Sequence, residues 1–511
     1  MALFLPVFIL LLSLLALATG NRFGRGFRSN WVVATGGALL SWLSLLFLRF
    51  RLPFSLSFSS WWSGQGLVFS SSWRLDEVSW PLASAMSSLL LSAFLSAVRQ
   101  AMSASWQTWA PGLALTAAAL LSALSSDLLT FAFTWVLLDV LVSAIQIDQF
   151  SKAEEKRGSL FQVSVNLVGI FLLLAAWALS TSAPELSKGL VIFSAALRLG
   201  IFTASRFAPK SNRLRKDIEL LLLLSPLAAS LALLAHAEGL SGQTANLILW
   251  LAFLPASYAA FKAIFAAPGK RGHLYWVLGQ AALAVVAAVS GASMATLVLS
   301  LALLFGGAML SLRPKVGYAR VPLIVVGGFA LSSLPFTPTY FTSEFFVSPS
   351  SVFVYIFLPI QALLLLAWLR QIWLGEEVEE PSEPWAHAIL NTSVYMLPIL
   401  FILLGVGFAP SLSPRNLQLI LWPGALNVIL TGLFALALRL PAPKLSSRVA
   451  GALEAFFSLS WLIRAGEILF RTIQWLLRFV NRLLEGEAGV LWALLLIALL
   501  LSLVAQYGLA G

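Results

Sequence analysis

The residues best suited to carry out chemistry lie in one apolar stretch, 328–345. This stretch contains Glu344 together with two prolines, Pro335 and Pro338. A proline inside a helix frees a backbone carbonyl and interrupts the helix, and a carboxylate held in apolar surroundings can bind a proton or a cation. The combination predicts an ion site beside a broken helix. A kinked structural helix with Glu344 at the lipid headgroups fits the same residues.

The rest of the sequence excludes most catalytic chemistry. The chain has no cysteine and only three histidines. Disulfides, iron–sulfur clusters and thiol catalysis are therefore excluded within this chain, and so few histidines argue against several haems. The sequence contains no Gly-rich phosphate loop, metal-ligand cluster or nucleophile triad. We expect no cofactor, no metal and no catalysis by this chain alone.

The composition indicates that lipid surrounds most of the chain. The sequence has 511 residues, of which 59% are hydrophobic and 10% charged, with a mean hydropathy of +0.91. Apolar runs long enough to cross the hydrocarbon layer recur about sixteen times, and in lipid each must be helical. We therefore predict an all-α integral membrane protein, with 3–20 retained as its first helix. The predicted spans are 3–20, 31–50, 81–98, 110–125, 128–147, 160–181, 188–206, 217–237, 246–267, 274–290, 293–312, 320–346, 351–374, 388–408, 416–440 and 488–507.

The loops between these runs alternate in charge. Strongly basic loops follow odd-numbered runs, and Arg49 with Arg51 is the exception. By the positive-inside rule both termini lie on the non-cytoplasmic side, in what we expect to be a bacterial inner (plasma) membrane. The net charge of +11 thus reflects membrane orientation and does not indicate a nucleic-acid partner.

Two regions do not look like simple spans. Residues 51–80, rich in Ser and Trp, are predicted to form an outer-side loop. In 448–487 charged residues recur every three, four or seven positions, which is typical of an amphipathic helix lying along the membrane interface. About forty helical residues reach roughly 60 Å, which indicates neighbouring subunits.

The 328–345 stretch resembles the broken twelfth helix of the antiporter-like subunits of complex I (NADH:quinone oxidoreductase), membrane-bound hydrogenases and multisubunit cation antiporters. Leu334-Pro335, Phe341 and Glu344-Phe345 match that helix, and the resemblance makes Glu344 the terminal proton-channel acid. Other matches follow in the family's order, among them 74–79, 126–135, 197–209 and 270–279.

The resemblance implies a domain organisation. It comprises N-terminal helices with an outer-side loop (1–109), a core of two inverted repeats with broken helices (110–375), peripheral helices (376–447), an amphipathic lateral helix (448–487) and a membrane anchor helix (488–511).

The chain also departs from this family. Val136 follows Trp135 where the family has a glutamate, and Asp139, one turn further on, is the candidate to replace it. Arg198 replaces a lysine of the seventh helix, and arginine does not release its proton at any useful pH. The titratable groups of the family's central relay are largely missing, including at Phe305.

Three functions follow as alternatives. In the first, the chain is a non-redox, membrane-arm subunit that moves protons or sodium ions, driven by peripheral redox subunits, with Arg198 and Asp139 paired near the midplane. In the second, it is a scaffold subunit of such a complex without conduction. In the third, it is a stand-alone secondary transporter with inverted repeats.

Overall fold

The computed structural model describes most of the chain up to residue 439. The described ranges are 2–22, 30–58, 62–64, 67–98, 105–149, 153–201, 215–266, 270–313, 317–347, 355–374, 383–406 and 414–439. Met1–Leu445 forms one compact unit and Ser446–Gly511 a second. The predicted lateral helix and anchor helix belong to the second unit and lie outside the described residues.

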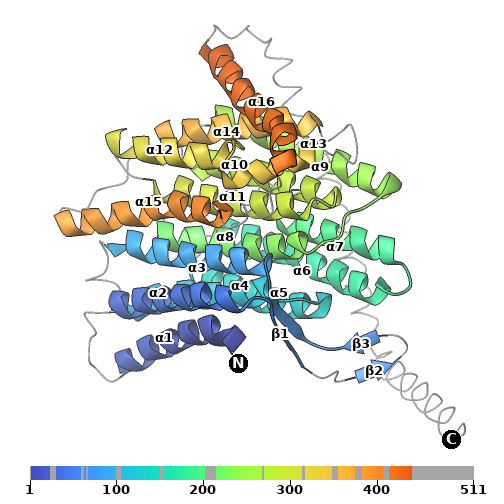
Figure 1. The fold of residues 1–511 in the computed structure, drawn as a ribbon. Helices are drawn as coiled ribbons and strands as arrows, with labels where there is room; N and C mark the ends of the chain where they lie inside the picture. Colours follow the sequence, from blue (N-terminus) through green and yellow to red (C-terminus); the bar gives the residue numbers. More distant parts are fainter. Residues whose placement is uncertain are drawn as a thin grey trace, which may run out of the picture. The chain divides into compact units, whose positions relative to one another are not determined.

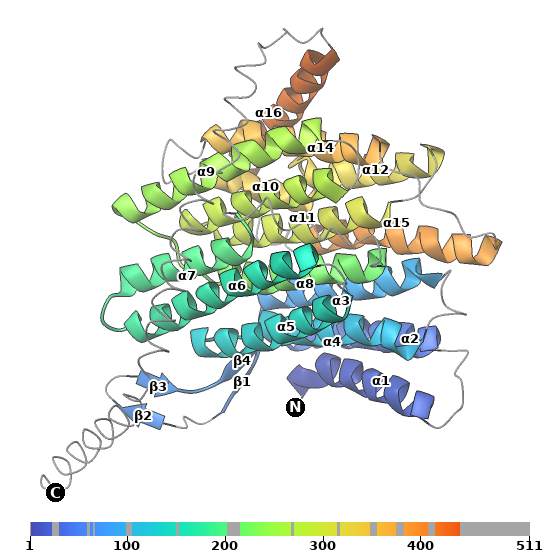
Figure 2. The ribbon, with the colours of Figure 1, turned by 180° about the vertical axis from the view of Figure 1, so that it is seen from behind.

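The first unit is built of helices that lie side by side (Figure 1, Figure 2). Helices α1 and α2 form one edge of the unit, whereas α14 and α16 lie toward the other. The α-helices are α1 (Leu5–Arg22), α2 (Asn30–Leu48), α3 (Ser79–Ser96), α4 (Trp106–Ala123), α5 (Leu128–Gln149), α6 (Ala153–Leu179), α7 (Pro184–Arg198), α8 (Lys216–Ala235), α9 (Gly242–Phe265), α10 (Lys270–Val289), α11 (Ser293–Leu312), α12 (Gly317–Leu331), α13 (Thr342–Val347), α14 (Phe357–Leu374), α15 (Pro384–Val406) and α16 (Pro414–Arg439).

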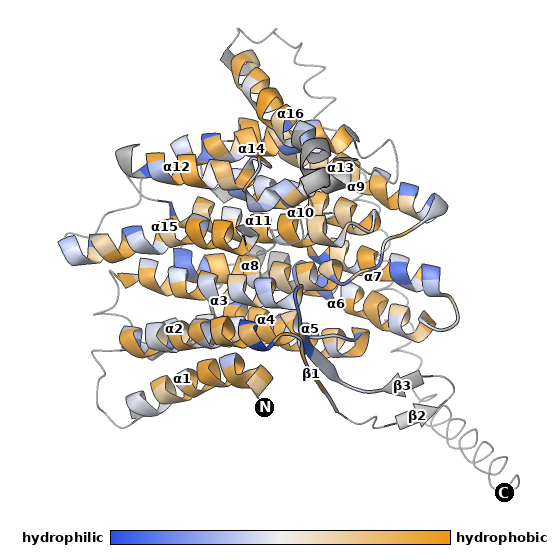
Figure 3. Cartoon of the chain, viewed as in Figure 1, coloured by the Kyte–Doolittle hydropathy of each residue, from blue (hydrophilic) through white to orange (hydrophobic). Residues whose placement is uncertain are grey.

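Within the described part of the chain, 11 helices are long and apolar enough to cross a membrane. The chain is thus an integral membrane protein, as the composition predicts. Apolar residues cover the middle of most helices (Figure 3). In the apolar stretch of α11, 94% of the residues are buried, against only 28% in the first candidate span, Ala2–Gly20. The core therefore lies around α11 and its neighbours α3, α8 and α10, and α1 is peripheral.

The seventh predicted span, 188–206, is wrong at its C-terminal end because α7 ends at Arg198. Gly200 adopts φ +79°, which favours glycine. The Gly200 N–H donates to the Leu197 carbonyl (3.1 Å) and the Ile201 N–H to the Ala196 carbonyl (3.3 Å). These two bonds are the Schellman ending of a helix, and they leave Arg198 as the last helical residue.

The predicted outer-side loop contains short strands that the sequence analysis missed. Strands β1 (Phe54–Ser57) and β4 (Ser72–Leu75) pair antiparallel, and so do β2 (Trp62–Gly64) and β3 (Leu67–Phe69). Strand β4 also bonds to the turn between α4 and α5, where the Arg74 N–H donates to the Leu124 carbonyl at 2.7 Å. Asp127 strengthens this junction by accepting bonds from the Ser72 N–H (2.8 Å) and from the Thr130 N–H at the start of α5 (2.8 Å).

Candidate functional site

An ion pair between α5 and α7 lies buried inside the first unit. Arg198 Nη1 lies 2.6 Å from Asp139 Oδ2, and Arg198 Nη2 lies 2.8 Å from Asp139 Oδ1. The two side chains are only 1% and 9% exposed, respectively. The structure thus brings together the two residues that the sequence analysis paired, in the bidentate geometry that best satisfies both charges.

Neighbouring side chains hold this pair in place. Trp135 lies one helical turn before Asp139, and the guanidinium carbon of Arg198 sits 4.3 Å from its ring centroid. Asn166 of α6 donates from Nδ2 to Asp139 Oδ1 at 3.0 Å. A Cβ at Gly169 would lie 3.0 Å from Arg198 Cγ, so the glycine lets α6 approach the arginine stem. Because Arg198 keeps its proton, this arrangement holds a fixed cation and cannot pass a proton through Arg198.

The second part of the site is an interruption after α12. This helix ends at Leu331, and the chain resumes as a 3₁₀ turn, η4 (Pro338–Phe341), and the short helix α13. Ser333 and Phe336 adopt φ +61° and +66°, a conformation that costs non-glycine residues about 1–2 kcal/mol each. Pro335 and Pro338 both belong to this segment, and Pro338 is its first 3₁₀ residue.

Hydroxyl and amide side chains bond the interrupted backbone. Thr339 Oγ1 donates to the Ala330 carbonyl (2.8 Å) and accepts from the Ser333 N–H (2.9 Å). Gln361 of α14 donates from Nε2 to Ser333 Oγ at 2.8 Å, and Ser333 Oγ lies 3.2 Å from Thr342 Oγ1. The break is therefore a buried cluster of neutral dipoles, which can solvate an ion without carrying charge themselves.

Helix α16 packs closely on this cluster. Asn427 Nδ2 donates to the Ser332 carbonyl at 3.1 Å. A Cβ at Gly424 would lie 2.1 Å from the Ser333 carbonyl oxygen, so only glycine allows this approach. The buried atoms Asn427 Oδ1 and Ser343 Oγ have no hydrogen-bond partner among the described residues, so both are able to accept further bonds.

Glu344 lies in α13, directly after this polar cluster in the chain. The conformation of its side chain is outside the described residues, so its role as the ion-carrying acid stays a prediction.

Helix α8 contacts α5 and α7, which carry the ion pair, and α11 contacts both α8 and the break. Helix α11 has no Asp, Glu, His, Lys or Arg, and neither does α8 after Glu219. The Phe305 ring, fully buried at the centre of α11, stacks on Phe401 of α15 with centroids 5.4 Å apart. Helix α11 and the part of α8 after Glu219 therefore offer no titratable side chain that could bind a proton in transit.

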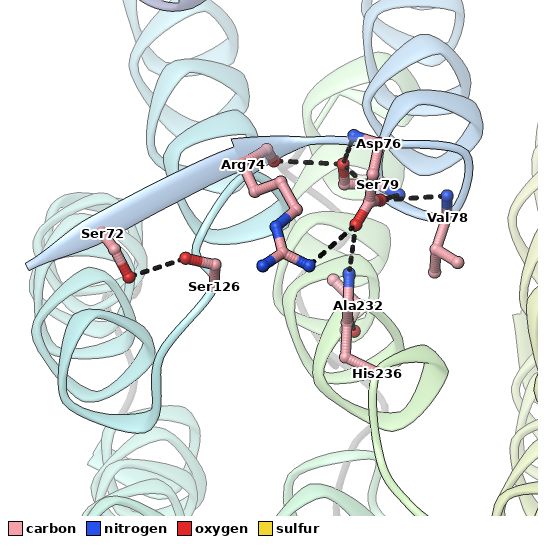
Figure 4. A network of polar contacts seen from close by, with 8 residues as sticks. All are labelled: Ser72, Arg74, Asp76, Val78, Ser79, Ser126, Ala232 and His236. Carbon is pink, nitrogen blue, oxygen red and sulfur yellow. Dashed lines mark hydrogen bonds and ion pairs between the residues drawn. The ribbon is translucent and has the colours of Figure 1, made fainter. Parts of the chain in front are cut away.

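Sequence reasoning missed two further polar clusters. Arg215 binds Asp217 through two hydrogen bonds (Nε–Oδ1 3.0 Å, Nη2–Oδ2 2.6 Å) and lies 4.4 Å from the centroid of the Trp109 ring. The second cluster joins Asp76 to His236 (Figure 4). Only the spacing Arg215-x-Asp217 signals the first pair, and nothing local in the sequence signals the second.

The described residues contain no group of three or more His, Cys, Asp or Glu that could hold a metal.

Solved structures share this arrangement of helices. A chain of the Mrp complex from Dietzia sp. DQ12-45-1b matches with a TM-score of 0.68 at 14% identity, over 100% of this chain and 63% of that one. A chain of the membrane-bound sulfane sulfur reductase, an archaeal respiratory membrane complex, matches with a TM-score of 0.63 at 15% identity, over 98% of this chain and 100% of that one. A chain of respiratory complex I from Thermus thermophilus with bound Aureothin has a TM-score of 0.57 at 18% identity, over 80% of this chain and 99% of that one.

The chain shares its fold with these three chains. The predicted resemblance is thus confirmed at the level of the fold, and these structural relatives are subunits of multisubunit membrane complexes. The chain spans 63% of the length of the Mrp-complex chain. No protein-family model and no curated protein sequence matches this chain.

Removing one member of the buried pair should destabilise the protein strongly. We expect Asp139→Ala to lower the free energy of unfolding by about 3–5 kcal/mol, because it leaves the Arg198 charge buried without its counter-ion. The double variant Asp139→Leu/Arg198→Met should recover most of this loss, since it removes both charges. Unfolding in mixed detergent micelles measures both. Glu185→Gln, at a carboxylate that is 62% exposed, is the control and should change stability little; equal losses in the single and double variants would contradict the account.

The contact of α16 with the break predicts that no side chain larger than that of glycine fits at position 424. Gly424→Ala should cost about 1–3 kcal/mol, because the new methyl group overlaps the Ser333 carbonyl. Gly432 lies on the same helix, and a Cβ added there would meet nothing within 4 Å, so Gly432→Ala is the matched control. Thermal unfolding in detergent compares the two, and an equal melting temperature would show that α16 does not pack tightly on the break.

Proposed function

We propose that the chain is a membrane subunit of a multisubunit, redox-driven complex, and that it takes part in moving protons or sodium ions across the membrane. The observation that carries this proposal is the buried helix break, lined by hydroxyl and amide groups and followed at once by the helix that contains Glu344. Electron transfer belongs to partner subunits in this proposal.

The physical case rests on what a break does in lipid. Unpaired backbone groups and buried hydroxyls are costly in hydrocarbon unless they form hydrogen bonds with one another or with a polar solute. Around this break, Thr339, Thr342 and Gln361 form such a cluster, and Ser343 Oγ and Asn427 Oδ1 can accept further bonds. A carboxylate next to such a cluster can hold a proton or a cation and release it again.

In this proposal the Asp139–Arg198 pair acts through its charges. Arg198 cannot lose its proton, so the pair can respond to an ion nearby only by opening and closing. Separation of the two side chains would leave the Arg198 charge without its counter-ion, and that charge would repel a cation. The pair is therefore an electrostatic gate and not a relay.

A second candidate function is a scaffold without conduction. The apolar centre around Phe305 favours it, because a proton crossing from the pair to the break finds no titratable side chain on α8 beyond Glu219 or on α11. The scaffold and the ion-moving subunit share the fold and differ in the function of Glu344.

Replacing Glu344 separates the two functions. In inverted vesicles that contain the intact complex, Glu344→Gln should lower ion transport per electron transferred about tenfold or more, because glutamine cannot bind and release a proton or neutralise a cation. Redox turnover, measured in parallel, reports assembly. Glu185→Gln should transport as the wild type does; unchanged transport in Glu344→Gln would exclude the ion-moving function and leave the scaffold.

A further inference from the structure

The carboxylate of Asp76 has two separate sets of partners (Figure 4). Oδ1 accepts from the Val78 N–H (3.0 Å), the Ser79 N–H (2.8 Å) and Ser79 Oγ (3.0 Å). These bonds satisfy amides at the start of α3, so this oxygen caps the helix. The other oxygen, Oδ2, faces His236 Nε2 at 3.6 Å and Arg74 Nη1 at 3.9 Å.

The geometry of His236 indicates where its protons lie. This residue directly follows α8, and its Nδ1 lies 2.8 Å from the Ala232 carbonyl. A carbonyl only accepts hydrogen bonds, so Nδ1 carries a hydrogen. A neutral ring would then turn the lone pair of Nε2 toward the Asp76 carboxylate, whereas a protonated ring turns an N–H toward it. The site therefore favours the charged imidazolium.

The titration of both groups agrees with this geometry. Burial disfavours the charged forms of both, but their contact outweighs it. With the bond to the Ala232 carbonyl, this contact raises the pKa of His236; with the bonds from Ser79, it holds the pKa of Asp76 well below its usual range. The side chains are 24% and 19% exposed, so protons can reach them.

None of Arg74, Glu238 and Asp127 supplies the counter-ion of His236. Arg74, on the Asp76 side, lowers the pKa of His236 by repulsion. Glu238, two residues after His236, pairs with Lys188 of α7 at 2.8 Å, and Lys188 also binds Glu185 at 3.2 Å. Asp127, at the start of α5, is occupied by Ser72 and Thr130. Asp76 is thus the carboxylate that binds His236.

We propose that His236 is a proton-binding site whose protonation latches the segment between β4 and α3 to the end of α8. Strand β4 is also bonded to the turn between α4 and α5. The bound proton therefore ties the end of α8 to a junction that already joins the start of α3 to the α4–α5 turn. This inference goes beyond ion movement at Glu344 and does not depend on it.

The pKa shifts of His236 and Asp76 determine how the stability of the latch depends on pH. A raised pKa of His236 means that the latch contributes fully below about pH 6.5 and is lost as pH rises through the raised value. A lowered pKa of Asp76 means that its charge survives well below its ordinary titration range. The latch therefore opens on the alkaline side.

Hydrogen–deuterium exchange of peptides covering residues 72–80 in the full-length protein tests the latch, after correction for intrinsic exchange rates. Wild-type protection should fall about three- to tenfold between about pH 6 and about pH 9, as His236 loses its proton. His236→Arg keeps a permanent cation and should stay protected at both pH values. His236→Gln should show the low, alkaline protection at both.

His387→Gln changes another histidine at a helix end and should keep the wild-type profile. Wild-type protection that does not change with pH, or a His236→Gln variant with the wild-type pH profile, would overturn the proposal. If His236→Gln does not fold, His236→Arg decides alone: a fall in its protection between the two pH values would also overturn it.

Discussion

In the hydrocarbon layer no water is available to bond a free amide or to solvate a charge, so the protein itself must satisfy every interruption of a helix and every buried ion. The two halves of the candidate site are two solutions to this constraint. Asp139 and Arg198 neutralise one another through two hydrogen bonds. The break after α12 carries no such pair among the described residues, and neutral groups from α14 and α16 complete its bonding.

These two solutions have different mechanical consequences. A bidentate pair against Trp135 is stable in one arrangement, and any change in it releases a full charge. A network of hydroxyls can exchange partners at little cost, since each is both donor and acceptor. Separating the ion pair is therefore costly, whereas the hydroxyl network of the break can rearrange more easily.

Much of this architecture could be predicted because lipid imposes it. Long apolar runs must be helices, and Pro335 with Pro338 marks the interruption within one of them. The end of α7 could also have been found, because Leu199-Gly200 follows a basic last turn, which is a common helix ending. The strands of 54–75 were missed because their alternation is weak and their pairing joins residues from both ends of a Ser-rich segment.

Contacts between distant helices could not be predicted from spacing alone. Asp139 and Arg198 were paired by family resemblance, and their contact also depends on Asn166 and Gly169 of α6. Asp76 and His236 belong to segments that meet only when α3 packs against α8. Gly424 reads as one small residue among many in an apolar run, and its importance is visible only in its approach to the Ser333 carbonyl.

The proposed function requires this chain to work as one membrane subunit of a larger redox-driven complex. Purification of the tagged protein from its native membrane in mild detergent, followed by mass spectrometry of what accompanies it, tests this most directly. We expect redox subunits of hydrogenase or quinone-reductase type to copurify in a fixed ratio and to elute with the chain as one species. A chain that elutes alone, as a stable monomer or homodimer, would contradict the account and favour a stand-alone transporter.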